Sequence, residues 1–405
     1  MNFDLAAIRR QFPVLRPGLH YLDSAASSQI PAPVIAAMDN FQRGGRANIA
    51  RGVHRLAERA TEAYEGARSR VARALNVAAD EIVFTAGCTA ALNIAAQGLG
   101  SRWGEGDEIV ISELDHHSNI VPWQILAVRS GVRLRWLPVT QEGRLDLDAL
   151  PGLLSPRTRL IAVTHGSNVT AAISDVPRLA AAARSAGALL LLDGAQVAAH
   201  GLPDLAALGC DLYAFSAHKL HGPTGIGVLW ARRAVLESMA PAFGGGGTIA
   251  RVAKSGTIFA DPPARFEAGT PPYVEAVGLG AAIDWRATID RNAADAHLAR
   301  LTQRLVDGLD AIDRQRRAIR VLGPTGPRLP LVSFAVRGAH THDICQMVDA
   351  SHGVALRGGH HCAQPLADAL GVEGSTRISL ALHSGDDDVD AALAAIDQAL
   401  GRLLR

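Results

Sequence analysis

Two residues with reactive side chains follow strands that are neighbours along the predicted sheet. Asp193 comes directly after the apolar run ALLLL, and Lys219 lies a few residues beyond the next run, DLYAF. The carboxyl ends of parallel strands meet at one edge of a sheet, so both side chains can face one ligand. Pyridoxal 5′-phosphate (PLP) needs a lysine amine as its anchor and an acid beside its pyridine nitrogen, because the protonated ring is an electron sink. Taken singly, the aspartate could cap a helix and the lysine could be solvated.

A phosphate group also needs donors, and the sequence offers them at two places. Cys88 and Thr89 open a helical run after the strand EIVF, and backbone N–H groups at a helix N-terminus bind anions well. Ser216 and His218 stand just before the lysine and supply two more donors. The plainer interpretation of Thr89 is a helix N-cap. The lysine turn itself, HKLHGPTGIG, is rich in Gly and Pro, which lets backbone approach a ligand closely.

A histidine follows a third predicted strand. His116 comes after the run DEIVIS, within the segment ELDHHSN. An imidazole ring at this edge of the sheet can stack on an aromatic cofactor, and an ordinary surface histidine is an equally good interpretation. The residue type and position alone leave both interpretations open.

The elements that must position these residues form an alternating pattern between about residues 80 and 230. The β-rich runs are EIVF (81–84), DEIVIS (107–112), RLIAVTH (159–165), ALLLLD (188–193), DLYAF (211–215) and GVLW (227–230). Such continuously apolar runs belong to strands buried on both faces, and the alanine-rich stretches between them predict helices. We therefore expect a large α/β domain with a mostly parallel sheet covered by helices. A preceding amphipathic helix is predicted from the spacing of Leu56, Ala60, Tyr64, Ala67, Val71 and Leu75.

The pattern changes after about residue 280. Two helical runs, LGAAIDW and HLARLTQRLVDGL, precede the strand LVSFAV (331–336) and a Gly/His-rich loop. A terminal helix then carries Val389, Leu393, Ile396 and Leu400 on one face. These runs predict a smaller α+β domain. The predicted division is a large domain over residues 20–275 and a small domain formed by residues 1–19 and 276–405.

Composition excludes several classes of protein. The chain has 405 residues, of which 48% are hydrophobic, which is enough for at least one large core, and we expect two domains. The 40 Lys and Arg residues nearly balance 39 Asp and Glu residues, so no net field attracts nucleic acid or an anionic membrane. We find neither a secretory signal nor a run of eighteen apolar residues, and the four cysteines lack Cys-x-x-Cys spacing. We expect a cytoplasmic protein with small-molecule or protein partners and no metal.

Several motifs are spread along almost the whole chain. They are YLDSAASSQIP (21–31), DHHSNIVPWQ (115–124), THGSNV (164–169), DGAQ (193–196), FSAHKLHGPTGIG (215–227), RFEAGTP (265–271), RGGHHCAQPL (357–366) and RISLAL (377–382). Together they resemble the class V (fold-type I) family of PLP enzymes, and within it the cysteine desulfurases of the SufS/CsdA type. The resemblance implies the fold-type I architecture, PLP as cofactor and a homodimer.

The resemblance also implies a role for each matching residue. Lys219 would be both the anchor of PLP and the general base of the reaction. Asp193 would pair with the pyridine nitrogen, His116 would stack on the ring face, and Gln196 would donate a hydrogen bond to the phenolic oxygen. The phosphate would be bound by Thr89, Ser216 and His218, beside Cys88, and by Thr270 of the neighbouring subunit. The substrate carboxylate would be held by Asn168 and Arg377, with Arg357 nearby.

Cys362 stands where this family keeps a cysteine that forms a persulfide. The resemblance implies that L-cysteine becomes L-alanine and that the sulfur passes through Cys362 to a small acceptor protein, for iron–sulfur clusters or another sulfur-transfer pathway. Neighbouring His and Arg side chains would lower the pKa of the thiol. The plainer interpretation is a small buried hydrophobe. A rival interpretation is a zinc site, although contiguous side chains do not easily converge on one ion; its ligands would be His340, His342, His360, His361 and Cys362.

Three segments depart from the family pattern near the cofactor and the substrate entrance. They are Ala90-Ala91, Thr170-Ala171-Ala172 and His383. These changes leave the PLP prediction intact and put the substrate in question, because related class V enzymes act on selenocysteine, kynurenine or other amino acids. Two alternatives therefore stay open. One is another PLP reaction, such as selenocysteine lyase, epimerase or aminotransferase chemistry, and the other is a non-catalytic or metal-binding α/β protein.

Overall fold

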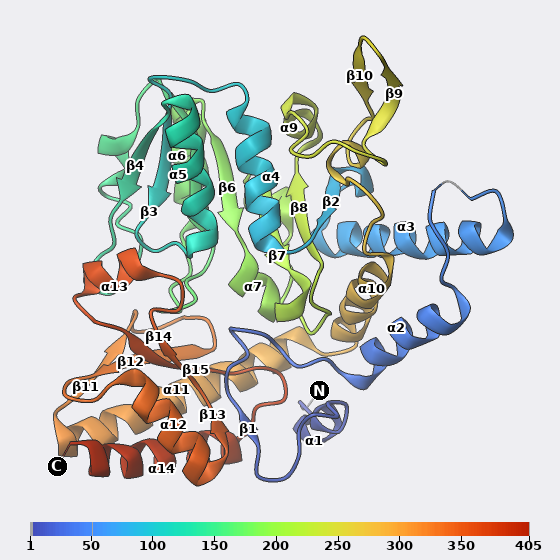
Figure 1. Cartoon of the computed structure of the whole chain (residues 1–405). Coiled ribbons are helices and arrows are strands. Elements are labelled where there is room, and N and C mark those ends of the chain that lie inside the picture. The colour runs from blue at the N-terminus through green and yellow to red at the C-terminus, as the bar shows by residue number, and fades with distance from the viewer. Residues whose placement is uncertain (1–2, 51, 405) are drawn as a thin grey trace.

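The computed structural model describes residues 3–50 and 52–404, and its largest element is a seven-stranded sheet (Figure 1). The strand order is β2-β8-β7-β6-β5-β3-β4. The strands span Ile82–Thr85 (β2), Glu108–Ser112 (β3), Arg133–Leu137 (β4), Thr158–Thr164 (β5), Leu189–Asp193 (β6), Leu212–Ser216 (β7) and Gly227–Ala231 (β8). Neighbours from β7 to β4 run parallel, whereas β8 is antiparallel to both β7 and β2. The sheet is therefore mostly parallel, as the sequence predicted.

Helices cover both faces of this sheet, which explains why its strands are continuously apolar. Successive residues of a strand point to opposite faces, so Val110 of β3 packs in one core while Ile109 and Ile111 pack in the other. The first core lies under α3 (Arg55–Leu75), α6 (Val176–Ala186) and α10 (Tyr273–Ala287). The second lies under α4 (Cys88–Gly100), α5 (Val121–Ser130) and α9 (Arg233–Ser238).

A separate antiparallel sheet has the order β11-β12-β15-β14. Its strands span Ile319–Leu322 (β11), Leu331–Val336 (β12), Ser375–Ser379 (β15) and Arg357–Gly359 (β14). The helices that share a core with this sheet include α11 (Arg291–Arg316), α12 (Thr341–His352) and α14 (Asp386–Leu403). The predicted apolar face of α14 is buried there at Val389, Ile396 and Leu400. The α+β character predicted for this part of the chain is present.

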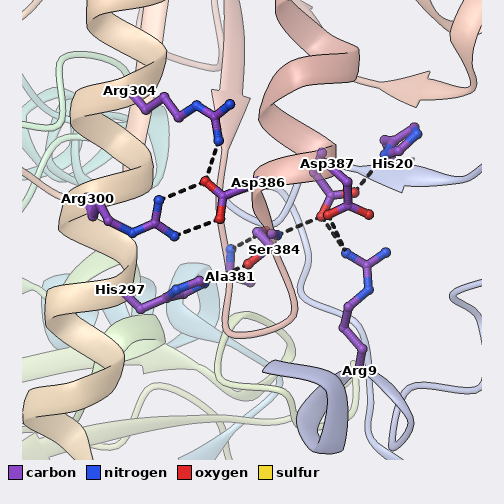
Figure 2. A network of polar contacts seen from close by, with 11 residues as sticks. Arg9, His20, His297, Arg300, Arg304, Ala381, Ser384, Asp386 and Asp387 are labelled. Atoms are coloured by element: carbon purple, nitrogen blue, oxygen red, sulfur yellow. Dashed lines mark hydrogen bonds and ion pairs between the residues drawn. The ribbon is translucent and has the colours of Figure 1, made fainter. Parts of the chain in front are cut away.

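The N-terminal segment packs against the same core. Ile8 and Phe12 are buried there together with residues of α11 and α14. Polar contacts reinforce this packing at the N-terminus of α14 (Figure 2), because both Arg9 and Nδ1 of His20 lie 2.7 Å from the Asp388 carboxylate. Acidic residues are favourable at this end of a helix. The N-terminal segment thus meets the start of α14. The domain boundaries at residues 19 and 275 stay a prediction.

The remaining helices, 3-10 turns and strands complete the described fold. The helices are α1 (Leu5–Arg9), α2 (Ala32–Gly44), α7 (Ala195–His200), α8 (Leu205–Leu208) and α13 (Gln364–Leu370). The 3-10 turns are η1 (Ala79–Glu81), η2 (His117–Asn119), η3 (Leu150–Leu153), η4 (Ala217–Lys219) and η5 (Ala264–Phe266). The strands are β1 (His20–Tyr21) paired with β13 (Val354–Ala355), and β9 (Ile249–Ala253) paired with β10 (Gly256–Phe259). Among the helices of the described residues, none is long and apolar enough to cross a membrane.

Local details differ from the sequence expectations. The buried stripe of α3 contains Ala57 rather than Leu56, which is 41% exposed, so the stripe begins one residue later than predicted. No continuous apolar run predicts the strand β4, because Arg133 and Arg135 are exposed at the edge of the sheet. The β9–β10 hairpin projects away from both sheets (Figure 1), and its residues are mostly exposed, so no buried face marks it in the sequence.

Among the residues that the structure describes, four histidines are buried, and loss of solvent lowers their pKa. The pKa is lowered to about 4 for His165 and His221 and to about 3 for His361 and His383. An unfolded histidine titrates near about 6.5, so between these values the unfolded chain binds more protons than the folded chain. Stability therefore rises with pH across this window and is lost as the pH falls through it.

We expect the cofactor-free protein to unfold at a temperature roughly 5 °C or more lower at pH of about 5 than at about 7.5. Calorimetry at the two pH values measures this shift, and indicator dyes measure the proton uptake on unfolding. Between about pH 7.5 and 8.5 the same histidines are neutral in both states, so little change is expected there. An unfolding temperature that stays constant down to about pH 5 would contradict the burial of neutral imidazoles.

Candidate active site

A cavity of about 190 Å³ lies at the carboxyl ends of β5, β6 and β7 and is lined from both sheets. It brings together nearly all of the predicted site residues, although they are spread over most of the chain. They are Cys88, Thr89, His116, Asn168, Asp193, Gln196, Ser216, His218, Lys219, Arg357, Cys362 and Arg377. Thr270 is the exception.

Asp193 and Lys219 enter this cavity from the ends of two paired strands. Asp193 is the last residue of β6, which pairs with β7, and Lys219 ends the turn η4 that follows β7. The Asp193 carboxylate is buried and accepts a hydrogen bond from the backbone N–H of Ala195 at 3.0 Å. Burial lowers the pKa of Lys219, while the charge of Asp193 opposes the shift. More of this amine is neutral, and hence nucleophilic, than in a solvated lysine.

The N-terminus of α4 forms another wall. Gly87 precedes the helix with φ of 146°, a conformation that favours glycine, and a Cβ there would lie 3.4 Å from Oγ of Ser216. The first helical N–H, that of Cys88, donates to Ser216 Oγ at 2.8 Å. With the Thr89 hydroxyl beside it, this helix end can receive an anionic group.

The ring of His116 is held by a serine. Nδ1 of His116 accepts from the backbone N–H of Ser118 at 3.1 Å and lies 3.0 Å from Oγ of Ser118. That hydroxyl also lies 2.7 Å from Oγ1 of Thr89. Burial, with a smaller effect of Lys219, lowers the pKa of His116 to about 4. The imidazole is thus neutral near pH 7, and its proton sits on Nε2, because Nδ1 acts as the acceptor.

Gln196 and His218 both line the cavity and contact the segment that contains Ala25 and Ser27. Nε2 of Gln196 donates to the carbonyl of Ala25 at 3.0 Å, while its buried Oε1 has no partner among the described residues. The second hydrogen on Nε2 stays available for a ligand. Burial, and then Lys219, lowers the pKa of His218 to about 4, and its Nδ1 lies 3.3 Å from Oγ of Ser27.

Two arginines meet where β14 pairs with β15. Arg377, which is 2% exposed, donates to the carbonyl of Asn168 at 3.0 Å and to Asp23 at 3.1 Å, and its buried Nε has no partner among the residues described. Arg357 lies opposite Arg377 in the strand register and 4.0 Å from the other oxygen of Asp23. Two guanidinium groups share one carboxylate, so this corner retains positive charge and suits a second carboxylate.

Cys362 lies on a tightly held loop at the mouth of the cavity. His361 and Cys362 have φ values of 53° and 57°, which lie in the left-handed region and are uncommon for residues with side chains. The carbonyl of His361 accepts from the Asn168 amide at 2.8 Å, and that of Cys362 accepts from the backbone N–H of His117 at 2.8 Å. The backbone is therefore fixed, while the cysteine itself is exposed.

Comparisons with known proteins agree with this geometry. The aminotransferase class-V family model matches residues 20–392. A probable cysteine desulfurase of Vibrio cholerae serotype O1 is 42% identical, with 100% of both chains covered. The crystal structure of the cysteine desulfurase CsdA from Escherichia coli has a TM-score of 0.92 and 39% identity, again covering 100% of both chains. A C-DES mutant with glycine linked to its PLP cofactor has a TM-score of 0.82 and 25% identity, covering 96% of this chain and 98% of its own.

The chain belongs to the class V aminotransferase family. Within it, the relatives above place the chain among the cysteine desulfurases. The predicted family, α/β fold and PLP dependence are confirmed by these comparisons. The roles of individual residues stay predictions.

The side chains in the cavity of this class V enzyme fit PLP. The second Nε2 hydrogen of Gln196, the helix end at Cys88 and Thr89 and the desolvated amine of Lys219 belong to residues that line the cavity, and each can donate to a polar, anionic group. Each of these features would be unfavourable in a packed core without a ligand, because buried polar groups need partners. The donor set therefore matches a phosphorylated aromatic aldehyde.

Thr270 lies apart from the cavity. It is exposed and lines a separate cavity of about 410 Å³. That second cavity also contains the buried pair of Arg68 and Glu267, which lie 2.7 Å apart. The prediction that Thr270 reaches the neighbouring subunit's phosphate stays a prediction.

The zinc interpretation of the histidine-rich loop finds no support in the geometry. Within residues 3–50 and 52–404, the group whose ligand atoms come within 4.8 Å of one another is His20, Asp387 and Asp388. None of these three is among the residues considered as zinc ligands, and Arg9 already pairs with both carboxylates.

The sequence reasoning missed two residues that organise the site. Asp23 pairs with Arg377, and Ser118 links His116 to Thr89. Both stand inside motifs that are visible in the sequence, YLDSAASSQIP and DHHSNIVPWQ. Polar residues within such motifs are the signal that could have identified them.

Proposed function

We propose that this class V enzyme removes sulfur from L-cysteine with PLP anchored on Lys219, and that Sγ of Cys362 takes up the sulfur. The observation that carries the proposal is that both side chains line one cavity. Of the four cysteines, Cys362 is the exposed one, so its sulfur can meet both a substrate and an acceptor.

PLP would be held by groups already aligned along the cavity. Its phosphate would meet the N-terminus of α4 with Thr89, Ser216 and His218, and its phenolic oxygen would meet Gln196 Nε2. Asp193 would pair with the ring nitrogen, and the neutral His116 ring would cover the ring face. When bound, PLP supplies an electron sink for the electron pair released at the substrate Cα.

Lys219 would also move the proton. Its buried amine is neutral more often than a solvated amine, so Nζ can accept the proton from the substrate Cα and return it later. Asp193 lies on the neighbouring strand and limits how far the pKa falls, so the amine can still hold the proton once it has been taken.

The substrate carboxylate would bind at the positive corner formed by Arg377 and Arg357. Arg377 is fixed by Asp23 and the Asn168 carbonyl, so its orientation is set before the substrate arrives. The free Nε–H of Arg377 is a donor that a carboxylate can satisfy. The amide of Asn168 already holds the Cys362 loop, and this contact supports a substrate site beside the thiol.

The sulfur transfer balances without an external oxidant or reductant. The thiolate of Cys362 attacks the substrate sulfur, so an S–S bond forms while the substrate C–S bond breaks. The substrate carbon receives a proton and leaves as L-alanine, and the enzyme keeps a persulfide. The persulfide sulfur would then pass to a small acceptor protein. The enzyme would act in the cytoplasm as a homodimer, in which Thr270 of each subunit would complete the phosphate site of the other.

Product analysis tests the proposal. With L-cysteine and a thiol reductant, the enzyme should release L-alanine and sulfide in equal amounts. L-selenocysteine and L-kynurenine are assayed in parallel, because other class V reactions would use them. If alanine formed only from L-selenocysteine, or only from L-kynurenine, the assignment to L-cysteine would be wrong.

A further inference from the structure

The carboxylate of Asp193 is held unevenly. Oδ1 accepts two hydrogen bonds, from the N–H of Ala195 at 3.0 Å and from Sγ of Cys88 at 3.3 Å. No described residue donates to Oδ2, although Asp193 lines the cavity. One oxygen is thus fixed by the protein and the other is left for a ligand.

Cys88 is well placed to fix that oxygen. It is the first residue of α4 and is 5% exposed. Its backbone N–H is anchored on Ser216 Oγ at 2.8 Å, at the end of β7, while its sulfur reaches Asp193 at the end of β6. One residue therefore ties the helix to both strands that carry the charged pair of the site.

The Cys88 sulfur is a donor because it stays protonated. Burial and the negative charge of Asp193 both raise its pKa well above the ordinary value for a thiol. A buried thiol with this neighbour cannot serve as a sulfur nucleophile, in contrast to the exposed Cys362. The polar group that the Cys88 side chain offers is its S–H, which donates to Oδ1 of Asp193.

We propose that Cys88 is a positioning residue, whose S–H donates to Asp193 Oδ1 and so directs Oδ2 toward the nitrogen of the cofactor ring. This inference rests on the proposed function, because it assumes that Asp193 meets the ring nitrogen. It adds that the aspartate is oriented by a thiol as well as by the backbone.

Removing the donor should have two measurable effects with defined signs. Without the S–H, the carboxylate can rotate and meets the ring nitrogen less well, so Cys88→Ala should raise the Kd of PLP for the cofactor-free protein about tenfold. The ring nitrogen should also lose its proton at a lower pH. If the lost hydrogen bond changed only the charge on Asp193, the pKa of the ring nitrogen would instead rise. A carboxylate with fewer donors is more basic, so the ring nitrogen would keep its proton to a higher pH.

Cys88→Ser is the matched control, because its hydroxyl keeps a donor in nearly the same volume. We expect it to bind PLP within about twofold of the unchanged protein. The readouts are a PLP titration of the cofactor-free protein and the ¹⁵N shift of ring-labelled PLP as a function of pH. Thermal unfolding of the cofactor-free variants checks that each one folds.

The outcomes separate this inference from the proposed function. Weaker binding in Cys88→Ala with recovery in Cys88→Ser supports it. Unchanged binding in Cys88→Ala, when Asp193→Ala binds PLP weakly, overturns the role of Cys88 and leaves the function intact. Equal loss in both Cys88 variants assigns the effect to packing and also overturns it. If Asp193→Ala bound PLP with unchanged affinity, Asp193 would not contact the ring nitrogen. The proposed role of Cys88 would then also be wrong.

Discussion

Replacing Lys219 with alanine is expected to abolish the visible absorption band of lysine-linked PLP. It should also lower alanine formation from L-cysteine by at least about 10³-fold. One amine is proposed to anchor the cofactor and to move the Cα proton, so a single substitution removes both contributions. Absorbance of the purified variant and an alanine assay measure the two effects separately.

The chain offers an unusually clear control for this experiment. Its sequence contains two lysines, Lys219 and Lys254, and Lys254 is exposed in the turn between β9 and β10. Lys254→Ala should keep the band and the activity. A Lys219→Ala protein with an unchanged band would show that the cofactor is anchored elsewhere.

Replacing Cys362 with alanine should have the opposite spectral result. The visible band should remain, because the cofactor contacts proposed here do not include this side chain. Alanine formation should fall by at least about 10²-fold, since no thiolate is left to attack the substrate sulfur. Mass spectrometry after a single turnover should detect an added sulfur on Cys362 of the unchanged enzyme and none on the variant.

Cys345→Ala is the matched control for that loss. Cys345 lies in α12, is partly buried and does not line the cavity, so activity should be retained. If Cys362→Ala formed alanine from cysteine at the full rate, the sulfur would not pass through this residue and the desulfurase mechanism would be wrong.

The parts of the fold that carry strong periodicity were predictable. The strands that end at Asp193 and before Lys219 are continuously apolar because helices cover both faces of the sheet, and that pattern is legible without a structure. The same rule places polar strand ends at one edge, which is why the cavity residues could be found together.

Other features depend on partners that a single sequence does not specify. Asp23 acquires its role only where β15 brings Arg377 beside it, 354 residues away. The bonds of Ser118, and the contact of Cys88 with Oδ1 of Asp193, depend on how α4 packs against the neighbouring strand end and turn. The edge strand β4 and the β9–β10 hairpin lack a continuously buried face, so no apolar pattern predicts them.

The most direct test of the central claim is to locate the cofactor chemically. Borohydride reduction of the holoenzyme fixes PLP to its amine, and peptide mass spectrometry then identifies the residue. The account predicts one label per chain, on the peptide that contains Lys219. A label on Lys254 or on the N-terminal amine, or a holoenzyme without any fixed label, would contradict it.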